Sequence, residues 1–528
     1  MTVTGGKGSA PNQGEVPKGW GWTTLGTIAD IRLGKMLSPK AYEHDLLQLP
    51  YLRNQNIRWG SIDFADVKRM GFRGEEIERF GLVPGDLLVC EGGAAGRCAV
   101  YLGPPCEFMY QKALHRVRPI VELSNSYFLQ FCLQHYVASG TVIPRLSETT
   151  IQHLPLEKIR ELKILLPPFA EQQRIVAEIE KQFSRLDAAM ESLNRIRANL
   201  KRYRASVLKA ACEGRLVPME AELARAEGRD YEPADVLLQR ILKERRAKWE
   251  AAELGKTEAN GKAEKSDKWK AKYREPVATN TSDRDKLPEG WCWATIGQIA
   301  LVQSGQTPKG VESAAAPEGE IPWFKVGDMN VRGNDVHMRI AKRRLTFAAA
   351  NRLGFHIMPA GTVVFPKRGG AIATNKKRLL AQPSCCDLNT MGIKPGDTVG
   401  AYFWWWFSSV DLGQLSDGSN VPQINHGDIE PLALPLPPVP EQQRIVFEVE
   451  RRLSVVEEIE AQVNANLKRA ERLRQSILKR AFEGKLVPQD PNDEPASVLL
   501  ERIRAERKAT GERDASRKRG NSTKKKQP

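Results

Sequence analysis

The sequence has few cysteines and no long hydrophobic run. Eight cysteines occur in 528 residues, none of them in a CxxC pair or at a zinc-site spacing from histidine. This usage excludes a disulfide-rich secreted fold and predicts reduced, mostly buried thiols. No stretch of about 18 uncharged apolar residues is present, and the first residues contain no apolar secretory segment. We therefore expect a soluble, cytoplasmic protein.

Motifs for catalysis and metal binding are also missing. The segment Gly255–Thr257 ends like a P-loop, but Glu250 stands where the first glycine is required, so this motif implies no nucleotide hydrolysis. Leu166 precedes Pro167–Phe169, where an amino-methyltransferase needs Asn or Asp to hold the target amine. The seven histidines are scattered, and no convincing carboxylate pair with a nearby lysine is evident. We predict no catalytic residue, no metal site and no enzyme activity of the chain alone.

Positive charge, by contrast, is abundant. Lys and Arg number 80 against 64 Asp and Glu, which gives a net charge of +16 and a pI near 9.4. This surplus favours a polyanionic partner, first of all nucleic acid, and a merely solubilising surface is the alternative. The content of 41% hydrophobic residues can form real cores. At roughly 100 to 200 residues per domain, the length predicts about three or four structural units.

The sequence repeats once. PPFAEQQRIVAEIEKQF from Pro167 returns as PPVPEQQRIVFEVERRL from Pro437, 270 residues later, and SVLKAACEGRLVP from Ser206 returns as SILKRAFEGKLVP from Ser476. A period this long excludes a stacked solenoid. It indicates a duplication whose halves are related by pseudo-two-fold symmetry. We expect the similar helical blocks to do one shared job, and the divergent blocks before them to do two versions of another.

Apolar residues at intervals of seven predict one long helix in each half. Each helix follows a Pro-Pro pair and ends near a glycine, and about 44 residues give it a length of roughly 65 Å. We expect the two helices to pack antiparallel through their apolar seams. Docking of each seam on its own globular neighbour is the alternative. The residues assigned to helix packing and subunit docking are Ile179, Leu186, Leu193, Leu200, Val207, Val449, Val456, Val463 and Ile477.

The divergent blocks contain short alternating runs bounded by Gly and Pro, which predict strands joined by loops. The aromatic run Phe403–Phe407 could stack on bases, but we interpret it as core. In the loops, Asn and Gln can bind adenine and Arg and Lys can bind guanine, each pair discriminating by about 1 to 3 kcal/mol. A structural or solvated role is the alternative for each side chain. The candidate DNA-binding residues are Arg53, Asn54, Gln55, Asn56, Arg58, Lys112, Arg145, Lys325, Asp328, Asn330, Lys367, Arg368, Asn375, Lys376, Lys377, Arg378, Asn420, Gln423 and Asn425.

These motifs resemble those of the specificity (S) subunits of type I restriction-modification systems. The paired helix openings carry the resemblance, together with SGQTPKG from Ser304, EIPWFKVGDMN from Glu320 and GDLLVCEGGAAGR from Gly85. It covers nearly the whole chain. It implies a non-catalytic, sequence-specific DNA-binding subunit that reads a bipartite site, one half per target recognition domain, with the helices setting the spacer.

The resemblance also implies partners. Two methylation subunits would bring S-adenosylmethionine and methylate adenine, and restriction subunits would use ATP and magnesium to translocate and cleave double-stranded DNA. No cofactor is expected in this chain. A scaffold that links two protein-binding domains and a self-contained methyltransferase are the alternatives from other classes. The recognition subunit of a fused restriction-and-modification enzyme is the nearest related alternative.

The predicted fold class is α+β, with two α/β target recognition domains held apart by two long antiparallel coiled-coil helices and an internal pseudo-two-fold repeat. The insert of residues 251–285 departs from the family pattern and is predicted as a polar linker. The predicted organisation is recognition domain 1 at 15–167, helical region 1 at 168–250, linker at 251–285, recognition domain 2 at 286–437, helical region 2 at 438–510 and a basic disordered tail at 511–528.

Overall fold

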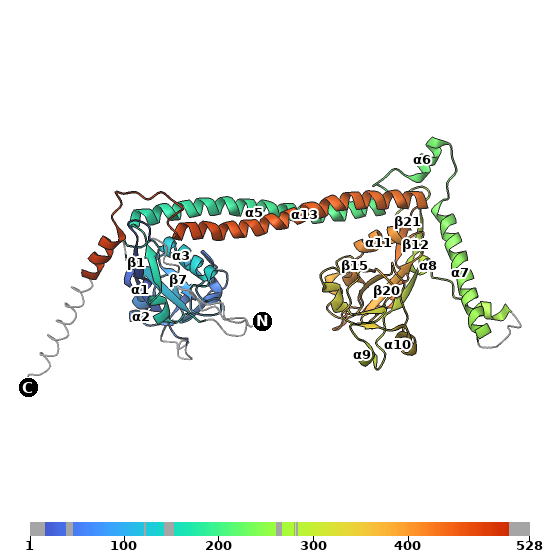
Figure 1. Cartoon of the computed structure of the whole chain (residues 1–528), viewed down its shortest axis with the longest axis horizontal. Coiled ribbons are helices and arrows are strands. Elements are labelled where there is room, and N and C mark those ends of the chain that lie inside the picture. The colour runs from blue at the N-terminus through green and yellow to red at the C-terminus, as the bar shows by residue number, and fades with distance from the viewer. Residues whose placement is uncertain are drawn as a thin grey trace, which may run out of the picture. The chain divides into compact units, whose positions relative to one another are not determined.

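The computed structural model describes residues 16–37, 46–120, 123–141, 153–259, 267–278, 280 and 284–505. The chain divides into two compact units (Figure 1). Unit 1 contains residues 1–194 and 464–528, and unit 2 contains residues 195–463. Each unit therefore combines one β-rich domain with parts of both long helices. The predicted tail lies outside the described residues.

The two long helices have the predicted length. Helix α5 (Phe169–Cys212) and helix α13 (Val439–Phe482) each contain 44 residues, and both begin directly after a Pro-Pro pair. Past their C-terminal ends, Gly214 and Gly484 have φ values of 67° and 68°. Glycine reaches this left-handed region without steric cost, so both helices end as the sequence predicts.

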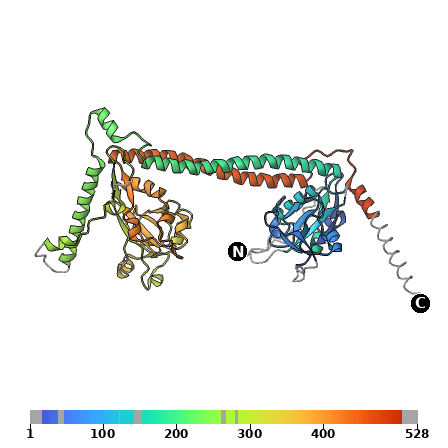
Figure 2. The same cartoon turned by 180° about the vertical axis from the view of Figure 1, so that it is seen from behind.

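Helices α5 and α13 run antiparallel, as their packing in each unit shows (Figures 1 and 2). In unit 1, Arg474 forms an ion pair with Asp187, and its guanidinium lies 4.4 Å from the ring centroid of Phe183. In unit 2, Arg204 Nη2 lies 3.1 Å from a carboxylate oxygen of Glu457. Residues with higher numbers in α5 thus contact residues with lower numbers in α13. The predicted antiparallel pair is confirmed.

The seam residues divide between two kinds of packing. Ile179 belongs to the core of unit 1, and Val449 and Val456 belong to the core of unit 2. The ends of both helices therefore pack on a globular domain as well as on each other, so both predicted alternatives describe part of the pair. Of the assigned residues, those that are buried are Ile179, Val207, Val449, Val456 and Val463, and those that are half-buried are Leu186, Leu193, Leu200 and Ile477.

Unit 1 is built on a four-stranded antiparallel sheet in the order β2-β10-β7-β8. Successive side chains of its third strand point to opposite faces, so Leu87 and Val89 enter one core while Leu88 and Cys90 enter another. A sheet β6-β3-β9 and the pairs β1-β11 and β4-β5 complete the unit. The elements are β1 (Gly21–Thr24), α1 (Leu25–Ile28), β2 (Ala29–Leu33), β3 (Leu47–Leu52), η2 (Asn54–Asn56), β4 (Ile57–Arg58), β5 (Ser61–Ile62), β6 (Lys68–Phe72), α2 (Gly74–Phe80), β7 (Leu87–Cys90), β8 (Cys98–Val100), β9 (Met109–Tyr110), β10 (Leu114–Pro119), α3 (Ser126–Ser139), α4 (Leu156–Arg160) and β11 (Lys163–Leu166).

Unit 2 repeats this plan with a five-stranded sheet, β13-β20-β17-β18-β15. The aromatic run lies in a helix whose Phe403, Trp406 and Phe407 are buried in the core, as expected. Its elements are α6 (Glu220–Glu227), α7 (Ala234–Ala259), η3 (Asp267–Lys272), β12 (Cys292–Thr295), α8 (Ile296–Ile299), β13 (Ala300–Ser304), α9 (Val311–Ala314), β14 (Ile321–Phe324), η4 (Val326–Asn330), β15 (His337–Met338), β16 (Arg344–Leu345), α10 (Phe347–Arg352), β17 (Val363–Pro366), η5 (Ile372–Thr374), β18 (Arg378–Leu380), β19 (Cys385–Cys386), β20 (Thr390–Pro395), α11 (Gly400–Ser409), η6 (Leu412–Leu415), α12 (His426–Ile429) and β21 (Ala433–Leu436).

The predicted linker is partly structured, which corrects the sequence prediction. Helix α7 continues to Ala259, and η3 forms a further turn inside the segment 251–285. An aromatic cluster explains why. The ring of Trp249 stacks on Trp269 at a centroid distance of 5.8 Å and lies 5.2 Å from the ring of Tyr273. These contacts bring the chain after α7 back onto the helix.

Each β-rich domain is completed by the helix that ends the other half of the sequence repeat. In unit 1, residues 496–505 are helical, and the Ala496 amide donates to the Gly19 carbonyl at 2.9 Å. In unit 2, the Ala234 amide at the start of α7 donates in the same way to the Gly290 carbonyl at 2.8 Å. The sequence Glu-Pro-Ala, which occurs at residues 232–234 and again at 494–496, thus marks a docking point on the start of each domain.

The Glu-Gln pairs of the PPxxEQQ motif anchor the long helices to the domains. Trp20 Nε1 donates to Glu171 at 3.0 Å, and Trp291 Nε1 donates to Glu441 at 3.1 Å. Both carboxyl groups are buried. Burial raises the pKa of Glu441, and it raises the pKa of Glu171 to about 7, although the Trp20 and Arg174 contacts oppose the shift.

The raised pKa of Glu171 predicts a pH dependence of stability. Between its ordinary pKa of 4.5 and about 7, the folded chain holds a proton that the unfolded chain has released. Stability from this group therefore falls as the pH rises through that window. We expect Glu171→Gln to melt at a higher temperature than the unsubstituted chain at about pH 8, and at a similar temperature at about pH 5. Trp20→Phe removes the donor to the carboxylate and should shift the melting temperature the opposite way at high pH. An equal difference at both pH values would contradict the assignment.

Candidate nucleic-acid interface

The central sheets of the two units have equivalent strand pairings where β7 ends in unit 1 and where β17 ends in unit 2. Leu114 of β10 pairs with Cys90 of β7, and Thr390 of β20 pairs with Pro366 of β17. After β7, Gly92 bridges to His153, and after β17, Arg368 bridges to Gln423. The polar residues predicted for base contact thus divide into those at this strand end and those elsewhere.

In unit 2, this strand end gathers a chain of polar side chains. Lys367 Nζ donates to Ser304 Oγ at 2.9 Å, and Ser304 Oγ lies 3.2 Å from His426 Nε2. Burial, with a smaller contribution from the neighbouring Arg368, lowers the pKa of Lys367. Beside this chain, Gln423 Nε2 donates to Asn425 Oδ1 at 2.8 Å. Of these residues, Ser304 and His426 were missed at the level of sequence, since a lone serine and scattered histidines carry no pattern.

In unit 1, the corresponding end is formed by Glu91, Gly92 and the loop of Asn54. Asn54 Nδ2 donates to the Gly92 carbonyl at 2.9 Å, and Arg97 donates to the Asn54 carbonyl at 2.9 Å. Asn54, a predicted base contact, therefore holds the η2 turn against the strand end. Glu91 was not predicted.

Two of the predicted base contacts, Asn56 and Asp328, each close a turn of their own. Asn56 is buried, accepts from the Arg53 amide and donates to the carbonyls of Asp63 and Asp66. Asp328 is its counterpart in unit 2, where it is buried and accepts from the Lys325 amide at 2.9 Å. Neither side chain is free to reach a base edge, because its polar atoms are engaged inside the turn.

Acidic side chains pair with the basic and amide side chains around these two turns. Arg53 pairs with Asp66 at 2.9 Å, and Gln55 donates to the same carboxylate at 2.6 Å. The two side chains lower the pKa of Asp66, with the Arg53 hydrogen bond contributing most. In unit 2, Lys325 donates to Glu312 at 2.6 Å.

A second predicted group of unit 2 lies around η5. Lys377 is buried, donates to Asn375 Oδ1 at 2.9 Å, and has its pKa lowered to about 8 by burial. Arg378 donates to the carbonyls of Lys377 and Met329. Lys376 contacts Asn330. Lys377 and Arg378 thus support the loop from inside, which is a structural role.

The other predicted residues are placed as follows. Arg58 is exposed and lies 3.6 Å from Asp63, while Lys112, Arg368 and Asn420 are exposed on loops. The three exposed cations of this set, Arg58, Lys112 and Arg368, suit phosphate contacts better than base readout. Arg145 lies outside the described residues.

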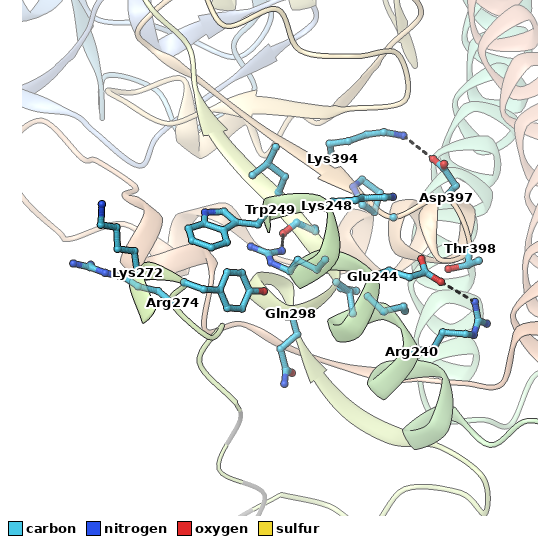
Figure 3. Close-up of a pocket in the computed structure, with 18 residues that line it drawn as sticks. Arg240, Glu244, Lys248, Trp249, Lys272, Arg274, Gln298, Lys394, Asp397 and Thr398 are labelled. Carbon is cyan, nitrogen blue, oxygen red and sulfur yellow. Dashed lines mark hydrogen bonds and ion pairs between the residues drawn. The ribbon is translucent and has the colours of Figure 1, made fainter. Parts of the chain in front are cut away.

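A large pocket of unit 2 lies at the other end of the same sheet (Figure 3). It has a volume of about 1000 Å³ and lies between α7, the segment after η3 and the strand ends Ala300 and Pro395. Ala300 pairs with Pro395, whereas Ser304 pairs with Met391, so the strands separate the pocket from Lys367 by about 13 Å. Two of its cations already have acidic partners, since Lys394 pairs with Asp397 and Arg240 with Glu244. Lys367, a predicted base contact, therefore lies at the opposite end of the sheet from this pocket.

Two further properties concern the described part of the chain. Within it, no group of three His, Cys, Asp or Glu side chains is arranged to hold a metal ion. Its helices also include none with the length and apolar character needed to cross a membrane.

Comparisons with known proteins identify relatives of the whole architecture. The model of the type I restriction modification DNA specificity domain matches twice, over residues 17–202 and 288–469. The specificity subunit of the Escherichia coli type I restriction enzyme EcoDI is 25% identical over 423 residues, covering 78% of this chain and 82% of that subunit. That of EcoBI, also from Escherichia coli, is 24% identical over 521 residues, covering 94% of each chain.

A solved structure has the same fold. A chain from a study of complex assembly and conformational transition in the type I R-M system has a TM-score of 0.59 and 18% identity. The match covers 89% of this chain and 100% of that one. The long helices and the two β-rich domains therefore have a known fold.

Proposed function

Because the chain belongs to the type I restriction modification DNA specificity family, we propose that it is the specificity subunit of a type I restriction-modification complex. In this proposal it reads a bipartite DNA site and directs adenine methylation and cleavage by partner subunits. One observation carries the proposal. Two units with the strand orders β2-β10-β7-β8 and β13-β20-β17-β18 share two continuous helices and differ in their polar loops. Two half-sites with different sequences require such a pair of readers.

Charge and loop chemistry support DNA as the ligand. The net charge is +16, and exposed cations such as Arg58, Lys112 and Arg368 suit phosphate contact. Side chains at the strand ends can then hydrogen-bond base edges in the major groove. This proposal also predicts a cytoplasmic protein, since a cell's DNA must be accessible to it.

Catalysis is assigned to partners. We propose that two methylation subunits supply S-adenosylmethionine chemistry and that restriction subunits supply ATP- and magnesium-dependent cleavage, with no cofactor held by this chain. Helix α13 offers a surface for such a partner in unit 2. Phe447 is 69% exposed, and Val455 and Ile459, which are four residues apart and therefore neighbours on the helix surface, are also exposed.

Salt dependence tests the proposal. A reader with roughly 6 to 10 phosphate contacts should lose about 10³- to 10⁵-fold in DNA affinity between 50 and 200 mM salt. We expect this loss for the complex with its methylation subunits, together with selection of one two-part sequence from a random duplex library. A scaffold that links protein domains would show neither. Methyl transfer by the purified chain alone would favour a self-contained methyltransferase.

A further inference from the structure

Glu91 and Lys367 occupy the same place in the two units. Each follows the last residue of a central strand, and the strand registers align Cys90 with Pro366. The Glu91 amide donates to the Ala113 carbonyl at 3.0 Å, and the Lys367 amide donates to the Asn389 carbonyl at 2.8 Å.

Two further features repeat at these two positions. The Glu91 carbonyl accepts from the Leu154 amide at 2.7 Å, and the Lys367 carbonyl accepts from the Ile424 amide at 2.9 Å. Two residues on, Gly93 and Gly369 have φ values of 75° and 74°, so both loops turn in the same left-handed way. The backbone is therefore shared, and only the side chains differ.

The side chains at this shared place have opposite charge. Lys367 and the exposed Arg368 stand where unit 1 has Glu91 and Gly92. Ser304 is the only hydrogen-bond partner found for the Lys367 ammonium in the described ranges, so no carboxylate neutralises it. Glu91 likewise has no hydrogen bond or ion pair to its carboxylate within those ranges. Half-buried charges without a counter-charge are costly in the free protein and available to a polar ligand.

We propose that Glu91 and Lys367 are equivalent specificity-determining residues that read bases of opposite hydrogen-bonding character in the two half-sites. Lys367 donates to the O6 and N7 acceptors of a guanine, and Glu91 accepts from the N4 amino group of a cytosine. The inference rests on the proposed function and adds which base class each unit selects.

The residues around Lys367 support a fixed direction for its ammonium. Ser304 Oγ accepts from Lys367 and lies beside His426, whose Nδ1 is 3.3 Å from Glu430. In unit 1, the residue at the Ser304 position is Leu33, since it pairs with His115 as Ser304 pairs with Met391. Ser304 and His426 are thus positioning residues of unit 2, and Ser304 has no polar counterpart on β2.

Methylation maps of variants test the inference. We would express the chain with its methylation partner and determine the methylated motif genome-wide by single-molecule sequencing. Lys367→Ala should relax one guanine of one half-site, with its preference over other bases reduced about tenfold or more. Glu91→Ala should relax one cytosine of the other half-site to a similar extent. In each variant, the rest of the motif should stay unchanged.

The controls lie away from these strand ends, Lys394 toward the other end of β20 and Glu107 in the loop between β8 and β9. Lys394→Ala and the exposed Glu107→Ala remove like charges away from the strand ends and should leave the motif intact. An unchanged motif in Lys367→Ala or Glu91→Ala would overturn the inference, as would relaxation of both variants in one half-site or relaxation at an adenine or thymine. If a variant methylates nothing, Lys367→Arg or Glu91→Asp should restore the original base, and failure to restore it also overturns the inference. Absence of any bipartite motif for the unsubstituted chain would instead sink the proposed function.

Discussion

Replacing Leu499 and Leu500 by alanine is expected to destabilise unit 1 by about 4 kcal/mol or more, although both residues lie more than 300 positions after its β-rich domain. Their side chains are only 5% and 4% exposed, and they belong to the same core as Trp20, Leu25 and Ile28. A buried Leu→Ala substitution costs about 2 to 5 kcal/mol because it removes apolar contacts and leaves a cavity. Since folded domains are stable by only about 5 to 15 kcal/mol, unit 1 should melt at a much lower temperature.

Calorimetry of the full chain measures this effect, with Val498→Ala as the matched control. Val498 lies in the same helix but is 43% exposed, so its removal should change the melting temperature little. The transition of unit 2 should stay where it is, because its own docking helix, α7, is untouched. Equal effects of the control and the double substitution would show that the helix of residues 496–505 does not complete unit 1.

The long helices were predictable because their determinants are local. A heptad pattern, a Pro-Pro start and a glycine stop act within one segment, and α5 and α13 match the predicted length. The heptads did not reveal that the end turns pack on the domains. An apolar residue such as Ile179 or Val449 gives the same sequence pattern whether it packs on a helix or on a sheet. Which of the two it contacts depends on the tertiary fold.

The candidate site was less predictable, for two physical reasons. Asn56 and Asp328 have the side chains of base readers, but the same short polar groups also close turns by bonding to nearby backbone, and that is their role here. Glu91 and Ser304 gain their place only when distant strands pair, which no local pattern records. The extension of α7 was missed because the contacts of Trp249 with Trp269 and Tyr273, rather than an aliphatic period, hold the inserted segment.

Shortening both long helices by one heptad should change the spacer of the DNA site and leave its two half-sites unchanged. Helices α5 and α13 each continue from one unit into the other. Removal of residues 193–199 and 463–469 preserves the seven-residue seam and shortens the pair by about 10 Å. At about 3.4 Å per base pair, this length corresponds to a spacer shorter by roughly three base pairs. Methylation of sites with the original spacer should fall at least about tenfold, because both half-sites can no longer be contacted together.

The methylation map of this shortened complex tests the central claim most directly, because it reads half-sites and spacer in one measurement. The map of the unsubstituted complex is its reference, and the single substitution Lys394→Ala is its control for expression and assembly. We predict the same two half-sites at a spacing reduced by roughly three base pairs. An unchanged spacer with undiminished methylation would contradict the claim that the two units read separate half-sites across a length that the helices set.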